Sequence, residues 1–383
     1  MTSRMASSEL MGMNGENEGE VSVPNTRKSR ILAVTCDPRP DRTAVPSTSL
    51  SSTMVAYNFE TVKATFASDG VLHVELNRPK KLNAFNQQLW QDVRQVFEKI
   101  KTDSDVRAVI VSGAGRLFTS GLDLSNSIHS GNIDPMSQTR IQCLLKTVNM
   151  IVADNIVAAV DRSKDPARTA YYLRPNIMNL QGSFTAIEES DKPVIAVVHN
   201  GCIGAGVDLI TACDIRLATK DAYFSVKVGS VILMDVGLAA DVGTLQRLPK
   251  VMGNHSVVRE ICLTGRKYAS FMVSRFTNCC SRIIVEADSL PAAEALQHGL
   301  VSKVLETKEE ALAEALKLAK DIASKSPVAV VGTKHLLNYS RDHSVAEGLA
   351  YTAVWNAAML NTDDVAKCAE SFMTKEKPIF AKL

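Results

Sequence analysis

The stretch KPVIAVVHNGCIGAGVDLITACDIRLAT, residues 192–219, indicates the fold class. Apolar residues dominate 192–201, which predicts a buried strand. That strand leads into a turn with three glycines, Gly201, Gly204 and Gly206. Residues 207–213 have helical character, and 214–226 contain strand-like segments. This order of strand, glycine-rich turn and helix is typical of an α/β fold.

The same alternation of strands and helices occurs earlier in the chain. Residues 70–79 alternate like a strand, 86–100 have helical periodicity, and 106–113 form an apolar run that predicts a buried strand. Helical sequence dominates from Glu310 onward. We therefore expect an α/β core over residues 57–309 and a helical C-terminal region over 310–383.

Composition narrows the function classes. The chain has 383 residues, of which 45% are hydrophobic and 22% charged, as in globular proteins. A net charge of +2 provides no field that would attract nucleic acid or an anionic membrane. No apolar stretch approaches the roughly 18 residues that a membrane span needs. The eight cysteines form no CxxC pair and the histidines lack metal-ligand spacing, so we expect reduced thiols and no metal site.

Four regions interrupt or precede the regular pattern. Residues 1–56 have no aromatic residue and are rich in small and polar residues, so we expect this N-terminal extension to be disordered. Its acidic residues argue against a mitochondrial transit peptide, although its serines and basic residues resemble one. Residues 128–155, 228–234 and 270–291 each split segments that would otherwise join. They are either surface insertions, which loops tolerate, or translated intron sequence.

Two glycine motifs are candidates for chemistry. GAGRLFTSGLDLS, residues 113–125, follows a buried strand, and the turn at 201–206 opens a helix. Free N–H groups at a helix N-terminus attract negative charge, so such a turn suits a phosphate or a developing oxyanion. A dinucleotide site is the alternative, with Asp221 as its acidic residue. Its pattern is G-x-G-x-x-G, whereas this chain has G-x-x-G-x-G.

Five blocks taken together resemble the enoyl-CoA hydratase/isomerase (crotonase) superfamily. They are NRPKKLNAF (77–85), GRLFTSGLDL (115–124), the stretch at 192–219, DVGLAADVGTLQRLPKVMGN (235–254) and SRDHSVAEGL (340–349). The last two blocks are most similar to the Δ(3,5)-Δ(2,4)-dienoyl-CoA isomerase branch. The resemblance implies a β-β-α spiral core with a helical C-terminal region, assembled as trimers or hexamers. It also implies an acyl-CoA substrate and no separate cofactor, because CoA is part of the substrate.

The resemblance implies an oxyanion hole that polarises the thioester carbonyl. Its two backbone donors map to Leu122 and to Ala205, the middle residue of GAG, where the family usually has glycine. Alanine retains the N–H, so the donor survives if its Cβ fits. The expected site also includes neighbours of the first donor, Ser120, Gly121, Asp123 and Leu124. The alternative interpretation is that both motifs are only tight turns.

The resemblance places two catalytic carboxylates at Asp208 and Asp241. Moving a diene requires removing a proton at one end and delivering one at the other, which suits two acids with different pKa values. The alternatives are structural: Asp208 lies near a helix N-terminus, and Asp241 is a candidate N-cap. The family pattern also has a glutamate between these acids. No glutamate stands between Lys227 and Asp235.

Two basic segments complete the predictions. Arg78, Lys80 and Lys81 are candidate CoA contacts, with a solvated surface loop as the alternative. The chain ends Ala381-Lys382-Leu383, a close variant of the Ser-Lys-Leu address that a peroxisomal import receptor recognises. We therefore expect a peroxisomal location, with the mitochondrion as the alternative.

Three functions remain open at this stage. The first is double-bond isomerisation of 3,5-dienoyl-CoA to 2,4-dienoyl-CoA in fatty-acid β-oxidation. The second is another crotonase reaction, such as hydration of 2-enoyl-CoA, which normally needs two glutamates and is weakened by Asp208. The third is a non-catalytic acyl-CoA-binding homologue that keeps the fold without the missing glutamate.

Overall fold

The apolar runs of the sequence form the centre of the main sheet. The computed structural model describes residues 56–123, 165–226, 239–264 and 289–383. Within these ranges the main sheet has the order β1-β2-β3-β4-β6-β9. Its strands are β1 (Val62–Ser68), β2 (Val71–Leu76), β3 (Ala108–Gly113), β4 (Val194–Val198), β6 (Ile215–Thr219) and β9 (Lys303–Leu305). β1 and β2 are antiparallel, and the remaining pairs are parallel.

A second, smaller sheet continues from the glycine turn. It consists of β5 (Gly201–Ile203), β7 (Tyr223–Ser225) and β8 (Leu290–Pro291). β5 pairs with β7 in parallel, and β7 pairs with β8 in antiparallel register. The buried Leu290 thus lies at the end of the predicted insertion 270–291, whose residues up to 288 are outside the described ranges. The insertions at 128–155 and 228–234 and the extension up to residue 55 are outside them as well.

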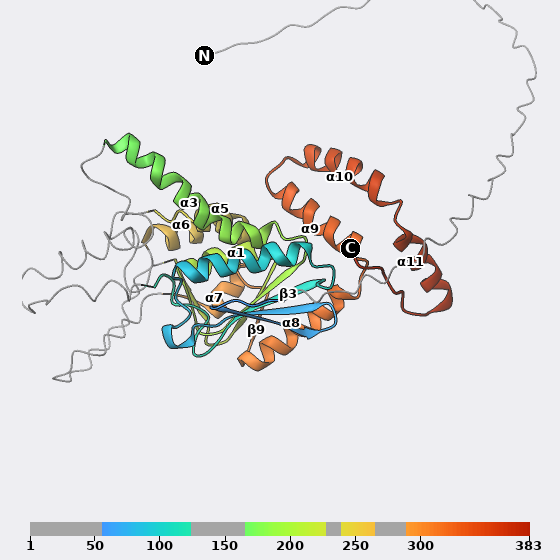
Figure 1. The fold of residues 1–383 in the computed structure, drawn as a ribbon, viewed down its shortest axis with the longest axis horizontal. Coiled ribbons are helices and arrows are strands. Elements are labelled where there is room, and N and C mark those ends of the chain that lie inside the picture. Colours follow the sequence, from blue (N-terminus) through green and yellow to red (C-terminus); the bar gives the residue numbers. More distant parts are fainter. Residues whose placement is uncertain (1–55, 124–164, 227–238, 265–288) are drawn as a thin grey trace, which may run out of the picture. The chain divides into compact units, whose positions relative to one another are not determined.

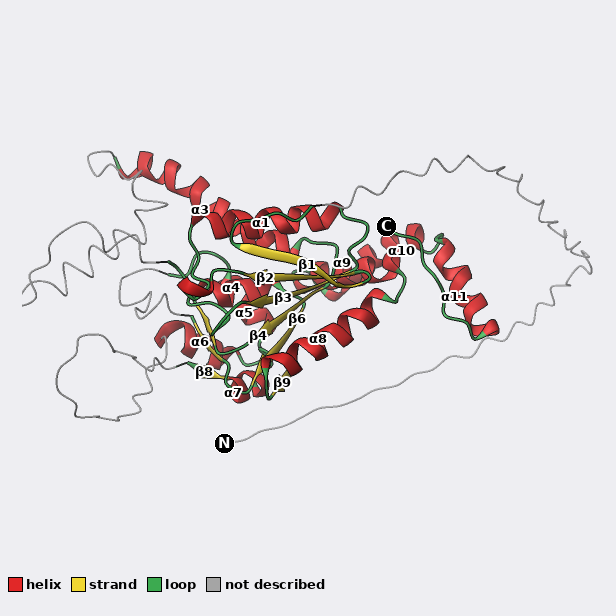
Figure 2. Ribbon diagram, turned by 60° about the horizontal axis from the view of Figure 1, so that its bottom comes forward, coloured by secondary structure: helices red, strands yellow, loops and turns green. Residues whose placement is uncertain are grey.

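Helices cover both faces of the main sheet. They are α1 (Gln87–Thr102), α3 (Pro166–Glu188), α4 (Ala205–Ala212), α5 (Thr244–Val251), α6 (His255–Thr264), α7 (Ala292–Gln297), α8 (Lys308–Ala323), α9 (Pro327–Arg341), α10 (Val345–Met359) and α11 (Asp363–Thr374). Figure 2 shows α1 on one side of the strands and α8 on the other. This coverage explains why β3 and β4 are buried along their whole length.

The two faces are packed by different side chains. On the α1 side, Phe85, Trp90 and Phe184 form an aromatic cluster with ring centroids 4.8 to 5.6 Å apart. On the other side, α8 presents alanines at every fourth position, and these lie on one face of the helix. They are Ala311, Ala315, Ala319 and Ala323, all buried against the sheet. Small side chains let α8 approach the strands closely, so α8 belongs to the core layer.

Most expected elements appear at the expected places, and α3 is the largest difference. The sequence predicts a helix over 184–190, whereas α3 begins at Pro166. Pro175 lies inside this helix, and its polar and apolar residues separate only weakly around the axis. Both features hide the helical period from sequence analysis.

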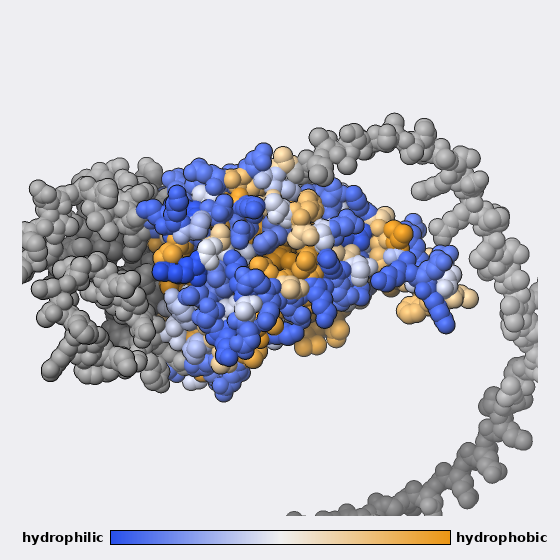
Figure 3. Space-filling view, turned by 90° about the horizontal axis from the view of Figure 1, so that it is seen from below, coloured by the Kyte–Doolittle hydropathy of each residue, from blue (hydrophilic) through white to orange (hydrophobic). Residues whose placement is uncertain are grey.

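The C-terminal helices leave apolar side chains exposed. The most exposed on α10 and α11 are Val345, Val354, Phe372 and Met373. Figure 1 shows α10 and α11 at the red end of the chain, away from the strands, and Figure 3 shows hydrophobic groups on an otherwise hydrophilic face. Among the described helices, none has the length and apolar character that crossing a membrane requires.

Candidate active site

The two glycine motifs lie side by side because the strands that lead into them pair. The Thr119 N–H donates to Gly201 O at 3.0 Å, and Thr119 O accepts from the Ile203 N–H at 3.1 Å. Gly121 has a φ of +86°, and a Cβ at this position would lie 3.1 Å from Ile203 O. The first turn therefore packs against the second so closely that a side chain at Gly121 would crowd the contact.

The backbone around Leu122 directs its N–H away from the neighbouring strand. The Phe85 N–H donates to Gly121 O at 2.7 Å, and the Asp123 N–H donates to Phe85 O at 3.0 Å. In such a parallel bridge the residue between the two bonded groups faces the other way. Within the described ranges, the Leu122 N–H donates to no backbone carbonyl. It is therefore a candidate donor to a ligand.

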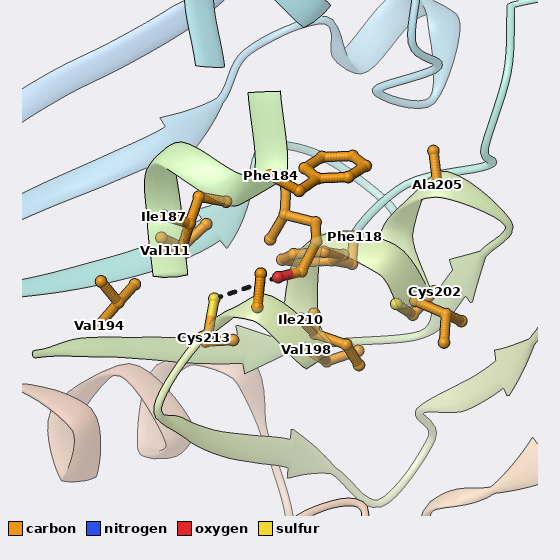
Figure 4. Packing of buried hydrophobic residues seen from close by; sticks show 14 of the residues in the cluster. Val111, Phe118, Phe184, Ile187, Val194, Val198, Cys202, Ala205, Ile210 and Cys213 are labelled. Atoms are coloured by element: carbon orange, nitrogen blue, oxygen red, sulfur yellow. Dashed lines mark hydrogen bonds between the residues drawn. The ribbon is translucent and has the colours of Figure 1, made fainter. Parts of the chain in front are cut away.

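Ala205 provides a second available N–H. It is the first residue of α4, and its N-cap Gly204 has φ +52° and ψ −114° and offers no side-chain cap. The first N–H groups of a helix have no intrahelical acceptor. Ala205 is buried and belongs to the hydrophobic core, and Figure 4 shows it at the start of α4. Its Cβ is thus accommodated at the position where the family usually has glycine.

The next residue, by contrast, must be glycine. A Cβ on Gly206 would lie 2.4 Å from Cγ2 of Thr119 and 3.0 Å from Sγ of Cys202. Such a contact is shorter than any side chain tolerates without displacement of its neighbours. Gly206 therefore allows α4 to start directly against the strand that carries the first motif.

Asp208 lies one turn into α4 and is buried, with 6% of its surface exposed. Its Oδ1 accepts the N–H of Thr244, the first residue of α5, at 2.5 Å. Burial raises the pKa of Asp208 from 3.8 to about 6; the hydrogen bond from Thr244 and the charge of Arg247 oppose this rise, whereas Asp241 adds to it. A carboxyl with this pKa exchanges protons near neutral pH.

Asp241 lies on the segment that precedes α5. Its backbone O accepts from Nε2 of Gln181 at 2.7 Å. Asp241 is an exposed residue, and desolvation of its carboxyl by the neighbouring chain raises the pKa above the ordinary value. The N-cap interpretation of Asp241 is wrong, because the N-cap of α5 is Gly243 and no side chain of the cap residue bonds there. The carboxylate that meets the N-terminus of α5 comes from Asp208, which is distant in sequence.

The predicted CoA contacts divide into two kinds. Arg78 forms an ion pair with Asp123 at 2.8 Å, and only 15% and 9% of these two side chains are exposed. Arg78 therefore ties the loop at 77–85 to the turn of the first donor. Lys80 and Lys81 lie in the short helix Pro79–Lys81 and are exposed. Ser120 is half-buried beside Gly121, and Leu124 lies outside the described residues, as does the segment 227–238 without the family glutamate.

Sequence analysis missed Asn83, which organises the first turn. Its side chain is fully buried, and Nδ2 donates to Ala114 O at 2.8 Å and to Leu117 O and Phe118 O at 3.1 Å. Its φ of +53° is a conformation that asparagine tolerates better than most residues. An asparagine inside the apolar context LNAF was the signal for this role.

The C-terminal tripeptide lies against the segment that leads into β3. Nη2 of Arg107 donates to Phe380 O at 3.0 Å and to Ala381 O at 3.1 Å. Lys382 forms an ion pair with Asp105, and Leu383 lines a small pocket together with Val106, Ile322 and Val330. Among the described residues, no group of three histidine, cysteine, aspartate or glutamate side chains is arranged to hold a metal ion.

Comparisons with known proteins agree with this geometry. The profile of the enoyl-CoA hydratase/isomerase family matches residues 67–161, 172–272 and 277–382. The chain is 47% identical to the "Delta(3,5)-Delta(2,4)-dienoyl-CoA isomerase, mitochondrial" of Rattus norvegicus over 320 residues, covering 84% of this chain and 81% of the relative. It is 37% identical to the peroxisomal protein of the same enzyme name from Arabidopsis thaliana, covering 86% of this chain and all of that relative.

Solved structures agree on the fold. A putative enoyl-CoA hydratase from Streptomyces coelicolor aligns with a TM-score of 0.62 at 25% identity, covering 85% of this chain and 96% of that one. The enoyl-CoA hydratase of Bacillus anthracis aligns with a TM-score of 0.62 at 21% identity, covering 84% and 99%. The expected crotonase-type fold is confirmed, and the dinucleotide-binding alternative is wrong. The chain belongs to the enoyl-CoA hydratase/isomerase family.

Proposed function

We propose that this enzyme converts 3,5-dienoyl-CoA to 2,4-dienoyl-CoA in fatty-acid β-oxidation. The observation that carries the proposal is the packing of the Gly121 turn against Ile203 and Gly204, which brings Leu122 and the first residue of α4, Ala205, into neighbouring turns. Helix α4 also carries Asp208, whose pKa burial raises. The names of the relatives from Rattus norvegicus and Arabidopsis thaliana support the same reaction.

In the proposed mechanism the thioester oxygen accepts hydrogen bonds from the N–H groups of Leu122 and Ala205. Loss of a proton from the α-carbon moves negative charge onto this oxygen, and each donor stabilises the resulting enolate by a few kcal/mol. The double bonds shift toward the thioester, and a proton is delivered at the far end of the diene. We assign that delivery to Asp241, whose pKa desolvation raises. We assign acceptance of the α-proton to Asp208, whose pKa of about 6 lets its carboxylate take up a proton near neutral pH.

The missing glutamate limits the rate in this proposal. By family position it would stand where the chain has Val228, and valine cannot accept a proton. A positioned acid or base contributes roughly 10²–10⁴-fold to a rate. We therefore expect the 383-residue chain to be slower than its relatives by at least about 10²-fold. This same feature favours a second candidate, an acyl-CoA-binding protein without catalysis.

A paired assay tests the proposal. The purified chain is given 3,5-dienoyl-CoA and 2-enoyl-CoA separately, and diene absorbance and water addition are followed. A variant in which Glu-Val replaces residues 228–234 restores the family spacing. It is expected to isomerise the diene faster by roughly 10²–10⁴-fold. Water addition as the main activity would contradict the isomerase, and binding without turnover by both proteins would favour the non-catalytic candidate.

We also propose a peroxisomal location and a homotrimeric or homohexameric state. The terminal Ala381-Lys382-Leu383 supports recognition by a peroxisomal import receptor, whereas the mammalian relatives are named mitochondrial. Fluorescent fusions with and without the last three residues distinguish the two organelles. The exposed apolar side chains of α10 and α11, such as Val354 and Phe372, support assembly. Light scattering that gives a stable monomer at micromolar concentration would contradict it.

A further inference from the structure

Helix α3 carries a polar stripe formed by Gln181, Thr185 and Glu188. Residues spaced by four and then three positions lie on the same face of a helix. All three side chains contact the segment 241–247, which connects Asp241 with α5. Figure 1 shows α5 beside the C-terminal half of α3.

The contacts of the stripe are specific. Nε2 of Gln181 donates to Asp241 O at 2.7 Å. Nε of Arg247 donates to Oε2 of Glu188 at 2.9 Å, and its Nη2 donates to Oγ1 of Thr185 at 3.1 Å. The stripe therefore holds the segment at both ends, by the backbone of Asp241 and by the side chain of Arg247.

The guanidinium of Arg247 lies over the turn between these two ends. Gly243 has a φ of +137°, and a Cβ at this position would lie 2.0 Å from Nη1 of Arg247. The residue after Gly243, Thr244, donates its N–H to Asp208. The turn after the exposed Asp241 is thus buried at Gly243 and Thr244, between the Arg247 side chain and α4.

The carboxylate of Glu188, which pairs with Arg247, stays ionised. Glu188 also pairs with Arg341 of α9, and only 15% of its side chain is exposed. Burial alone would raise its pKa, but Arg247 and Arg341 lower the pKa of Glu188 below its ordinary value. The ion pair that fixes Arg247 therefore persists near pH 6, where Asp208 exchanges its proton.

We propose that Gln181 and Arg247 are positioning residues that hold Asp241 at the far end of the bound diene. This inference rests on the proposed function, in which Asp241 delivers the proton. A carboxyl that transfers a proton must lie within hydrogen-bonding reach of the reacting atom, and a misplacement of about 1 Å costs up to roughly 10²-fold in rate. Holding the Asp241 backbone is a direct way to fix that distance.

The test uses Gln181→Met, which keeps the side-chain length and removes the donor to Asp241 O. Asn179→Ala is the matched control, because Asn179 lies on the same helix and accepts a hydrogen bond from Arg94 of α1 instead. We expect Gln181→Met to lower kcat by roughly 10-fold, with KM for 3,5-dienoyl-CoA changed less than about 2-fold. Amide hydrogen exchange of residues 239–251 should become faster in Gln181→Met and remain unchanged in Asn179→Ala.

The outcomes distinguish failure of the positioning role from failure of the proposed isomerase function. Unchanged exchange in Gln181→Met, or faster exchange with unchanged kcat, would overturn the positioning role. An equal loss of kcat in Asn179→Ala would also overturn it, because the effect would then reflect general loosening of α3. A wild-type chain that binds acyl-CoA without isomerising it would refute the proposed function, and the exchange measurement would still decide whether Gln181 holds the segment.

Discussion

Replacing Asp208 with asparagine is expected to stabilise the folded chain at neutral pH. Burial raises the pKa of Asp208 from 3.8 to about 6, so the folded state binds this proton more tightly than the unfolded state. The stabilisation that comes from protonated Asp208 is present in full below pH 3.8 and is lost as the pH rises through 6. At pH 7.5 the ionised Asp208 carboxylate therefore lowers the free energy of unfolding by about 1–3 kcal/mol, and the upper value corresponds to the full rise in pKa.

Asparagine removes this cost and keeps the local contact. Its side-chain oxygen still accepts the Thr244 N–H, the bond that joins α4 to the first residue of α5. The gain in stability should shrink as the pH falls toward 4, because Asp208 itself becomes neutral in the folded protein. Isomerase activity should fall at the same time, since asparagine does not exchange a proton in this range.

Urea-induced unfolding of both proteins at pH 7.5 and pH 4.5 measures the effect. Asp321→Asn is the control, because it removes the same charge from an exposed i,i+4 ion pair with Lys325 and should change stability by less than about 0.5 kcal/mol. A variant less stable than wild type by about 1–2 kcal/mol at pH 7.5 would refute the reasoning. Asp208 would then stabilise the fold as a cap of α5. Its burial would not lower the stability of the fold in exchange for proton transfer.

Three further changes test other parts of the structure. Asp241→Asn should abolish isomerisation while calorimetry with a saturated acyl-CoA shows nearly unchanged affinity; normal turnover would remove Asp241 from the mechanism. Gly206→Ala should lower the free energy of unfolding by about 1–3 kcal/mol, because its Cβ would meet Thr119 at 2.4 Å, whereas Gly253→Ala, with nothing within 4 Å, serves as control. Arg107→Gln removes a donor to the two carbonyls that precede Lys382, so carboxypeptidase should release the C-terminal residue faster than from wild type. Equal release rates would show that this contact does not hold the tail.

The sequence alone determined the fold class and the identity of the key segments. Its apolar runs at 106–113 and 192–201 predicted strands that the structure places in the buried centre of the sheet, as β3 and β4. The glycine spacing at 201–206 predicted a helix start with free N–H groups, which α4 provides. These features are local, because strand and helix periodicity and the freedom of glycine depend on neighbouring residues.

Sequence reasoning failed where the partner lies far along the chain. The helical stretch predicted at 184–190 is only the end of α3, whose earlier turns give no clear amphipathic signal. Nothing in the sequence indicated the ion pair between Arg78 and Asp123, 45 residues apart, and the CoA contact of Arg78 stays a prediction. Asp241 was a candidate cap of α5, a role that Asp208 takes from α4.

Only the tertiary structure decided how the acids are held and which of them is buried. A carboxylate such as Asp208 has the same local sequence signal whether it faces water or the N-terminus of a helix 36 residues later. Its pKa depends on desolvation and on charges brought near by packing, such as Arg247, which itself depends on Glu188. Residue types and their order along the chain are therefore enough to predict the elements of this enzyme, whereas the proton chemistry of its carboxyls follows from long-range packing.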